Sequence, residues 1–272
     1  MAYKKLNFKC KDRDLLIALL DAIPFNGFQE TNEGVLAFIS EKDFNSEHQL
    51  LIEDLQQKLS FEYATTSMPY ENWNQKWESS FQPVIIDKFC AVRADFHDAV
   101  LGIEHDIIIN PKMAFGTGHH ATTSAVMSLM KDMDFENKNV FDYGCGTGIL
   151  AILAEKLGAK SIFCIDIEEE AYLNTLENMQ KNHCHKMEVK KGDIALLKES
   201  YDLILANINR NVILDSIETL SQHLIIGGML VISGFLTEDK EIVVKKLKEH
   251  GFIEKQIKEI NGWLCILAKN LA

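Results

Sequence analysis

VFDYGCGTGIL, residues 140–150, holds three glycines that alternate with larger residues and follow a single acid, Asp142. Glycine loses more backbone freedom on folding than any other residue, so this density is costly unless the chain needs left-handed conformations or a close approach. Apolar residues precede the glycines and a helical pattern, GILAILAEKLG, follows them. We therefore expect a strand, a tight turn starting at Gly144 and a helix, with a ligand lying close against the turn.

The chain around this segment repeats the same alternation. From residue 138 onward, apolar strand patterns alternate with amphipathic helix patterns, which is typical of parallel strands covered by helices on both faces. The last two strand patterns, 252–260 and 263–269, are joined by Asn261-Gly262, a strong hairpin signal. The predicted fold is α/β, with a Rossmann-like sheet that ends in an antiparallel hairpin strand.

The glycine turn does not have the pattern of a phosphate-binding loop. A nucleoside triphosphate would require a lysine after the last glycine, and none follows Gly148. A dinucleotide would require GxGxxG, but the sixth position counted from Gly144 is Ile149. Asp142 would also lie near a pyrophosphate of the same sign. These features disfavour a phosphate ligand.

An adenosyl ligand with positive charge fits the turn better. S-adenosylmethionine carries a sulfonium and an ammonium and no phosphate, so an acid beside the turn attracts it. Asp166 follows the next strand pattern, 22 residues after Gly144, where an acid that binds ribose hydroxyls is expected. Asp193 follows the third strand pattern and is predicted to face the adenine. A tight turn without any ligand is the less favoured interpretation.

The chain before the sheet divides into further parts. Residues 1–68 show a βαββαβ order of patterns, which predicts a small ferredoxin-like α+β domain. In residues 69–82, three aromatic residues recur at every fourth position, which predicts a linker helix with one apolar face. Residues 83–272 form the predicted catalytic domain, and its first strand pattern covers 84–94.

Composition and charge restrict the classes of function. The 272 residues carry a net charge of −12 without a basic cluster, which disfavours direct nucleic-acid binding. The six cysteines include no CxxC pair, and the adjacent His183, Cys184 and His185 cannot easily converge on one ion, so no metal site is expected. No apolar run approaches ~18 residues and the start has no signal-peptide pattern. We expect a cytoplasmic monomer without membrane contact.

A resemblance to a known family is carried by five segments: NPKMAFGTGHHATT (110–123), FDYGCGTGILAI (141–152), IDI (165–167), LANI (205–208) and ENWNQKW (71–77). The chain resembles the bacterial ribosomal protein L11 methyltransferase family, which implies a substrate-recognition domain, a linker and a catalytic domain. The resemblance implies S-adenosylmethionine as the methyl donor and amino groups of ribosomal protein L11, on lysine side chains or the N-terminus, as acceptors.

The matching motifs also imply roles for individual residues. His119 fills a variable position, and Ala121 stands where the family commonly has proline. As an alternative to cofactor contact, Thr122 and Thr123 would only begin a helix as ordinary polar residues. The resemblance implies catalytic roles for Phe115, His120 and Asn207, and cofactor contacts for Thr123, Gly144, Cys145, Gly146, Asp166, Ile167, Asp193 and Asn207.

Methyl transfer to an amine is an in-line displacement that depends mainly on positioning. The amine must first lose its proton, and a desolvated site lowers its pKa. Asn207 is predicted to orient the amine, and no dedicated base is apparent. An RNA or other nitrogen methyltransferase of the same fold is the alternative, although LANINR lacks both prolines and the aromatic residue of the (Asn/Asp)-Pro-Pro-(Tyr/Phe) motif. A noncatalytic adenosyl-binding or nicotinamide-binding protein is a third possibility.

Overall fold

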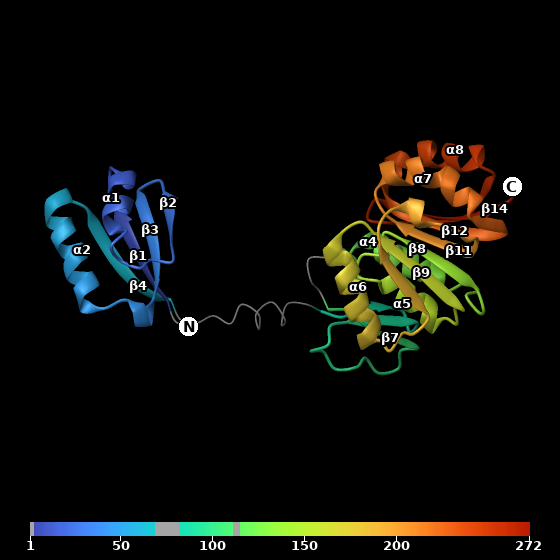
Figure 1. Cartoon of the computed structure of the whole chain (residues 1–272), viewed down its shortest axis with the longest axis horizontal. Helices are drawn as coiled ribbons and strands as arrows, with labels where there is room; N and C mark the ends of the chain where they lie inside the picture. Colours follow the sequence, from blue (N-terminus) through green and yellow to red (C-terminus); the bar gives the residue numbers. More distant parts are fainter. Residues whose placement is uncertain (1–2, 69–81, 111–114) are drawn as a thin grey trace. The chain divides into compact units, whose positions relative to one another are not determined.

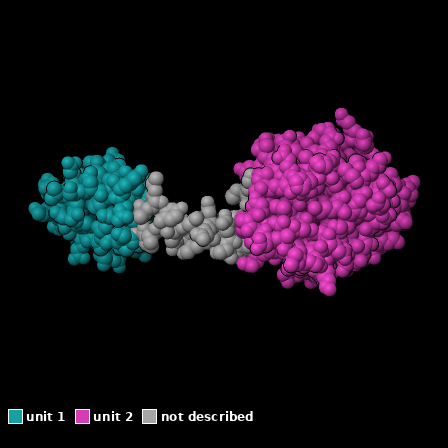
Figure 2. All heavy atoms as spheres, turned by 90° about the horizontal axis from the view of Figure 1, so that it is seen from below, with its two compact units in different colours: residues 1–81 teal, residues 82–272 magenta. Residues whose placement is uncertain are grey.

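The computed structural model describes residues 3–68, 82–110 and 115–272, and the chain divides into two units, 1–81 and 82–272 (Figures 1 and 2). The predicted linker helix over 69–82 lies, apart from Gln82, outside the described residues. Among the residues that are described, no helix is long and apolar enough to cross a membrane.

The first unit is a four-stranded antiparallel sheet with two helices. Its strand order is β2-β3-β1-β4, and with the chain order βαββαβ this is the ferredoxin-like arrangement that the sequence predicts. Alternate residues of β1, Leu6 and Phe8, pack with Leu16 of α1 and Ile52 of α2 in one buried core. The elements are β1 Tyr3–Lys9, α1 Arg13–Leu20, β2 Gly27–Thr31, β3 Gly34–Ser40, the 3-10 turn η1 Glu41–Asp43, α2 Ser46–Leu59 and β4 Glu62–Met68.

The second unit is built on a seven-stranded sheet in the order β10-β9-β8-β11-β12-β14-β13. Neighbouring strands are parallel from β10 to β12, and β14 runs antiparallel between β12 and β13, as the Asn261-Gly262 hairpin predicts. The strands are β8 Asn139–Tyr143, β9 Ser161–Asp166, β10 Met187–Lys191, β11 Tyr201–Asn207, β12 Leu224–Leu236, β13 Phe252–Ile260 and β14 Trp263–Asn270.

Helices cover both faces of this sheet (Figure 1). Successive residues of β8 point to opposite faces, so Val140 joins the core beneath α4 and α5 while Phe141 joins the core beneath α7 and α8. Both faces are therefore apolar, as expected of a buried parallel sheet. The helices are α4 Ala121–Met130, α5 Ile149–Lys156, α6 Glu169–Lys181, α7 Arg210–Gln222 and α8 Lys240–Glu249, with 3-10 turns η2 Ile194–Leu196 and η3 Thr237–Asp239.

A small three-stranded sheet precedes the large one, and here one prediction was wrong. The single strand predicted over 84–94 is a hairpin, with β5 Val84–Ile86 antiparallel to β6 Cys90–Arg93. Asp87 turns the chain with a φ of 50°, a left-handed conformation that periodicity alone does not reveal. β6 then pairs in parallel with β7 His105–Ile108.

The strand order fixes where a ligand can bind. From β8 the chain moves outward through β9 and β10, then returns to the other side of β8 at β11. Ligands bind at such a switch point, outside the carboxyl ends of the strands. The glycine turn follows β8 and Asn207 ends β11, so both lie at this edge.

Candidate functional site

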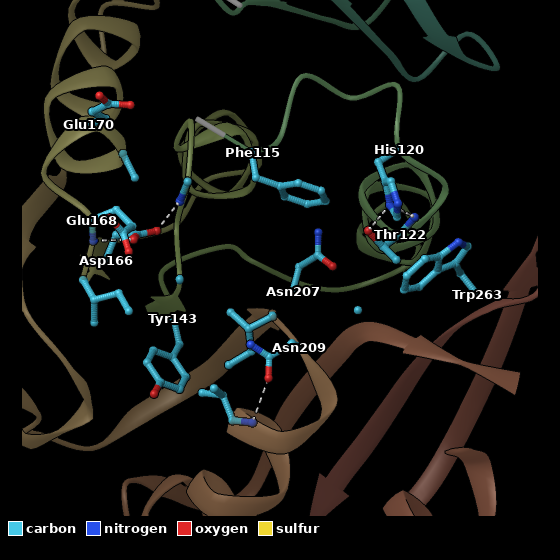
Figure 3. A pocket seen from close by; sticks show the side chains of 17 residues that line it. Phe115, His120, Thr122, Tyr143, Asp166, Glu168, Glu170, Asn207, Asn209 and Trp263 are labelled. Carbon is cyan, nitrogen blue, oxygen red and sulfur yellow. Dashed lines mark hydrogen bonds between the residues drawn. The ribbon is translucent and has the colours of Figure 1, made fainter. Parts of the chain in front are cut away.

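A cavity of about 660 Å³ opens at the carboxyl ends of β8, β9 and β11 (Figure 3). Several residues predicted from the sequence line it, namely Phe115, His120, Gly144, Gly146, Asp166, Ile167 and Asn207. The other lining residues are Thr122, Tyr143, Glu168, Glu170, Ala171, Ile208, Asn209, Val212, Gly234 and Trp263.

The three glycines of the turn are required by geometry as well as by space. Gly144, Gly146 and Gly148 have φ values of 70°, 57° and 79°, in the left-handed region that other residues rarely adopt. A Cβ on Gly146 would lie 2.3 Å from the carbonyl oxygen of Phe115, and one on Gly144 would lie 2.2 Å from Ile208. The side-chain-free surface therefore accommodates neighbouring protein segments and, on the side that lines the cavity, leaves room for a ligand.

We expect Gly146→Ala to destabilise the protein by ~2 kcal/mol, since the added methyl group meets a backbone carbonyl and the left-handed φ disfavours alanine. Gly27→Ala is the matched control, because nothing lies within 4 Å of its Cβ position and Gly27 has no positive φ. Urea denaturation of both variants measures the difference. Equal stability of the two variants would contradict the close approach of Phe115.

Asp166 joins the second strand to the turn. It ends β9, and its Oδ2 accepts a hydrogen bond from the Gly146 N–H at 2.9 Å while its Oδ1 accepts one from the Glu168 N–H at 3.0 Å. Both bonds fix the carboxylate at the edge of the cavity, where an oxygen has a further lone pair for a ligand hydroxyl. Glu168 and Glu170 also line this edge and make it acidic.

Asp142 lies beneath the turn and is only 1% exposed. Burial is the main cause that raises the pKa of its carboxyl to about 7; the Ala151 backbone N–H lowers this pKa and the charge of Asp166 raises it. Neither carboxylate oxygen makes a hydrogen bond of good geometry with any described residue. The ionised form of Asp142 is thus costly in the protein by itself, and a nearby cation would favour it.

Asn207 lines the cavity, and its side chain carries a buried acceptor without a partner. Its Nδ2 donates to the Thr123 Oγ1 at 3.3 Å, whereas its Oδ1 is buried and has no partner among the residues that the structure describes. A buried acceptor without a donor costs about 1–3 kcal/mol. A ligand N–H or O–H at this position would remove that cost.

Three aromatic rings form the wall opposite the acids (Figure 3). The His120 ring lies between the other two, with ring centroids 5.2 Å from Phe115 and 4.8 Å from Trp263. His120 also caps α4, since its Nδ1 accepts from the Thr122 N–H at 3.3 Å and lies 2.8 Å from the Thr122 Oγ1. Its Nδ1 is therefore engaged in local structure.

Trp263 lines the cavity but is not among the residues predicted from the sequence. β14 is the antiparallel strand, so it begins at the edge where the parallel strands end, and its first residue falls beside the cavity. The hairpin signal Asn261-Gly262 directly before it could have indicated this position, because it predicts both the turn and the reversed direction.

Three predicted cofactor residues do not line the cavity. The thiol of Cys145 is buried and lies 3.4 Å from the Thr175 Oγ1, and burial raises the pKa of this thiol. Thr123 is fully buried behind Asn207. Asp193 is exposed, and its Oδ1 accepts from the Ala195 N–H at 3.0 Å as the cap of η2. In the described part of the chain, no group of His, Cys, Asp or Glu side chains is arranged to hold a metal ion.

The sheet order, the single antiparallel strand, the glycine turn and the acid that ends β9 together define a class I S-adenosylmethionine-dependent methyltransferase. The family model described as ribosomal protein L11 methyltransferase (PrmA) matches residues 18–271. The chain belongs to the ribosomal protein L11 methyltransferase family, which confirms the family and the fold that the sequence predicts.

Relatives and solved structures agree. A protein of Porphyromonas gingivalis named ribosomal protein L11 methyltransferase is 42% identical over 258 residues, which is 93% of this chain and 89% of the relative. One of the same name from Chlorobaculum tepidum is 34% identical over 266 residues, 94% of this chain and 92% of the relative. The ribosomal protein L11 methylase structure from Lactobacillus delbrueckii subsp. bulgaricus superposes with a TM-score of 0.66 at 28% identity, over 71% of this chain and 100% of its own. A methyltransferase from Pyrococcus furiosus, with a TM-score of 0.52 at 16% identity over 60% of this chain and 88% of its own, shares the fold alone.

S-adenosylmethionine is the methyl donor of this class. The residues present fit it, because the cavity combines an open glycine edge, acids on one side and an unpaired acceptor, Asn207 Oδ1. The predicted cofactor is thus confirmed at the level of the family.

Proposed function

We propose that the protein methylates amino groups of ribosomal protein L11, on lysine side chains, the N-terminal amine or both. The names of relatives at 34–42% identity over almost the whole chain support the substrate. The observation that carries the proposal from the structure is the unpaired Asn207 Oδ1, an acceptor suited to an amine N–H beside an acidic edge and an aromatic wall.

The donor side of the cavity is assigned to the turn and its neighbours. When bound, S-adenosylmethionine supplies a methyl group activated by its sulfonium. The Asp166 carboxylate accepts hydroxyl protons in hydrogen bonds, and Ile167, 62% exposed, offers an apolar surface at the cavity. Gly144 and Gly146 leave the backbone accessible. Cys145 and Asp193 are proposed to support this side through their backbone or their neighbours, since their side chains lie outside the cavity lining. Thr123, whose side chain also lies outside the lining, is proposed to act through Asn207, to which it is hydrogen-bonded.

The acceptor side is assigned to Asn207 and the aromatic residues. The Asn207 Oδ1 accepts an N–H of the incoming amine and so orients its lone pair. Phe115, His120 and Trp263 exclude water around the amine, and desolvation lowers the pKa of a lysine ammonium so that its neutral form becomes accessible. Catalysis in this scheme depends on positioning and desolvation, with no base assigned.

The remaining roles follow from the substrate. The ferredoxin-like unit is proposed to recognise ribosomal protein L11, and the segment 69–82 to link it to the catalytic unit. A ribosomal-protein substrate favours a cytoplasmic location. We also propose that the protein is a monomer, and sedimentation equilibrium measures its oligomeric state.

Incubation with labelled S-adenosylmethionine and purified ribosomal protein L11 tests the function. We expect label in L11, located by mass spectrometry at lysine or N-terminal amines, and no label in L11 whose amines have been acetylated. Ribosomal RNA is included as a competing acceptor, because an RNA methyltransferase is the alternative. Label in the RNA with none in L11 would reject the proposal in favour of that alternative.

A further inference from the structure

The side chain of Thr147 holds the segment that bears Phe115 against the glycine turn. Thr147 is fully buried, and its Oγ1 donates to the carbonyl oxygen of Gly116 at 2.6 Å. Its backbone N–H donates to the carbonyl oxygen of Phe115 at 3.0 Å. Two consecutive carbonyl groups are therefore bound by one residue of the turn, and Phe115 lines the cavity directly beside them.

The fit at this contact is close from both sides. A Cβ on Gly116, whose φ is 109°, would lie 2.8 Å from the Thr147 Oγ1. A Cβ on Gly146 would meet the Phe115 carbonyl oxygen at 2.3 Å. A side chain at either glycine would push the turn and the 115–116 segment apart, so the two hydrogen bonds depend on both glycines.

Helix α6 fixes the turn from behind. The Asn178 Nδ2 donates to the carbonyl oxygen of Thr147 at 2.9 Å, and the Thr175 Oγ1 donates to that of Gly146 at 2.8 Å. The Asn178 Oδ1 also accepts from the Asn110 N–H at 3.0 Å. Thr147 thus lies in a buried polar network that joins α6, the turn and the segment carrying Phe115.

We propose that Thr147 is a positioning residue, which fixes Phe115 on the acceptor side relative to the turn on the donor side. Its side chain does not line the cavity, so it acts through Phe115. The proposal rests on the acceptor role of Phe115 proposed above. It follows that loss of the Thr147 hydroxyl harms transfer more than donor binding.

Thr147→Val and Thr147→Ser separate this role from simple stability. We expect Thr147→Val to lower kcat about tenfold at saturating donor and L11, with the Kd for S-adenosylmethionine changed less than about threefold. Thr147→Ser restores the donor hydroxyl and is expected to restore kcat. If Thr147→Val does not fold, Gly116→Ala displaces the same contact from the other side and is expected to lower kcat similarly.

Thr175→Val is the matched control. Thr175 is also fully buried and its hydroxyl donates to a carbonyl of the same turn, but its hydrogen bonds go to Gly146 and Cys145 and not to the 115–116 segment. We expect a comparable loss of stability with kcat within about threefold of the unsubstituted protein. A kcat loss in Thr175→Val equal to that in Thr147→Val would overturn the proposal, as would an unchanged kcat in Thr147→Val.

Amide hydrogen exchange at residue 147, followed by NMR, gives a readout that needs no activity. Exchange of this N–H is expected to accelerate about tenfold in Thr147→Val, and to stay slow in Thr147→Ser and in Thr175→Val. Slow exchange in all three variants would overturn the positioning role even if L11 is methylated. Fast exchange in Thr147→Val alone would support the contact even if L11 proved not to be the substrate, so the two proposals fail separately.

Discussion

Asn207→Ala is expected to slow methyl transfer about 10²–10³-fold while leaving the protein folded. Among the described lining residues, Asn207 carries the buried side-chain acceptor that has no partner, and the substitution removes it, so the amine loses the group that orients it. The amide also donates to the Thr123 Oγ1, a single neutral bond at 3.3 Å whose loss costs ~1 kcal/mol. Steady-state transfer to L11 and the midpoint of urea unfolding measure the two effects.

Asn211→Ala is the control, because Asn211 is an exposed asparagine four residues further along and outside the cavity lining. We expect its transfer rate to match that of the unsubstituted protein. Asn207→Asp adds a sharper comparison, since it keeps an acceptor oxygen but removes the amide N–H bonded to Thr123. Full activity of Asn207→Ala would remove Asn207 from the site.

Asp142→Asn is expected to stabilise the protein at pH 8 by up to about 4 kcal/mol. Burial raises the pKa of this carboxyl from 3.8 to about 7, so its ionised form is disfavoured in the folded state. Well below the unfolded pKa of 3.8 the carboxyl is protonated both folded and unfolded and costs nothing. As the pH rises toward 7 the unfolded chain ionises first, stability falls, and above 7 the loss is complete.

The difference between Asp142→Asn and the unsubstituted protein should therefore be small near pH 4 and reach its plateau above pH 7. Urea unfolding across this range measures it, and Asp98→Asn, at an exposed position, controls for the loss of one negative charge. A difference that does not change with pH would show that the folded protein does not raise the pKa of the Asp142 carboxyl.

Donor binding should weaken about tenfold in Asp142→Asn, because the acid attracts a cationic ligand.

The features predicted well from the sequence are those fixed by local chemistry and spacing. The alternating glycines predicted the turn, the βαβ length placed Asp166 at its edge, and Asn261-Gly262 predicted the antiparallel strand. Each of these signals lies within one unit of structure, so it does not depend on how distant segments pack.

The features that were missed depend on contacts between distant segments. Trp263 reaches the cavity only because β14 runs antiparallel to the other strands, and Thr147 bonds to Phe115 and Gly116, about 30 residues earlier in the chain.

Asp193 follows the third strand as predicted, but its carboxylate caps a 3-10 turn, a local bond that competes with a ligand. Side-chain direction at strand ends is set by such bonds, which strand spacing does not report.

We propose that the glycine turn and Asp166 form a site for a cationic adenosyl ligand in place of a phosphate-bearing one. Isothermal titration of the purified protein with S-adenosylmethionine, and in parallel with NAD, tests it most directly. We predict saturable binding of S-adenosylmethionine at one site per chain and no heat of binding from NAD. Binding of NAD without binding of S-adenosylmethionine would contradict the account.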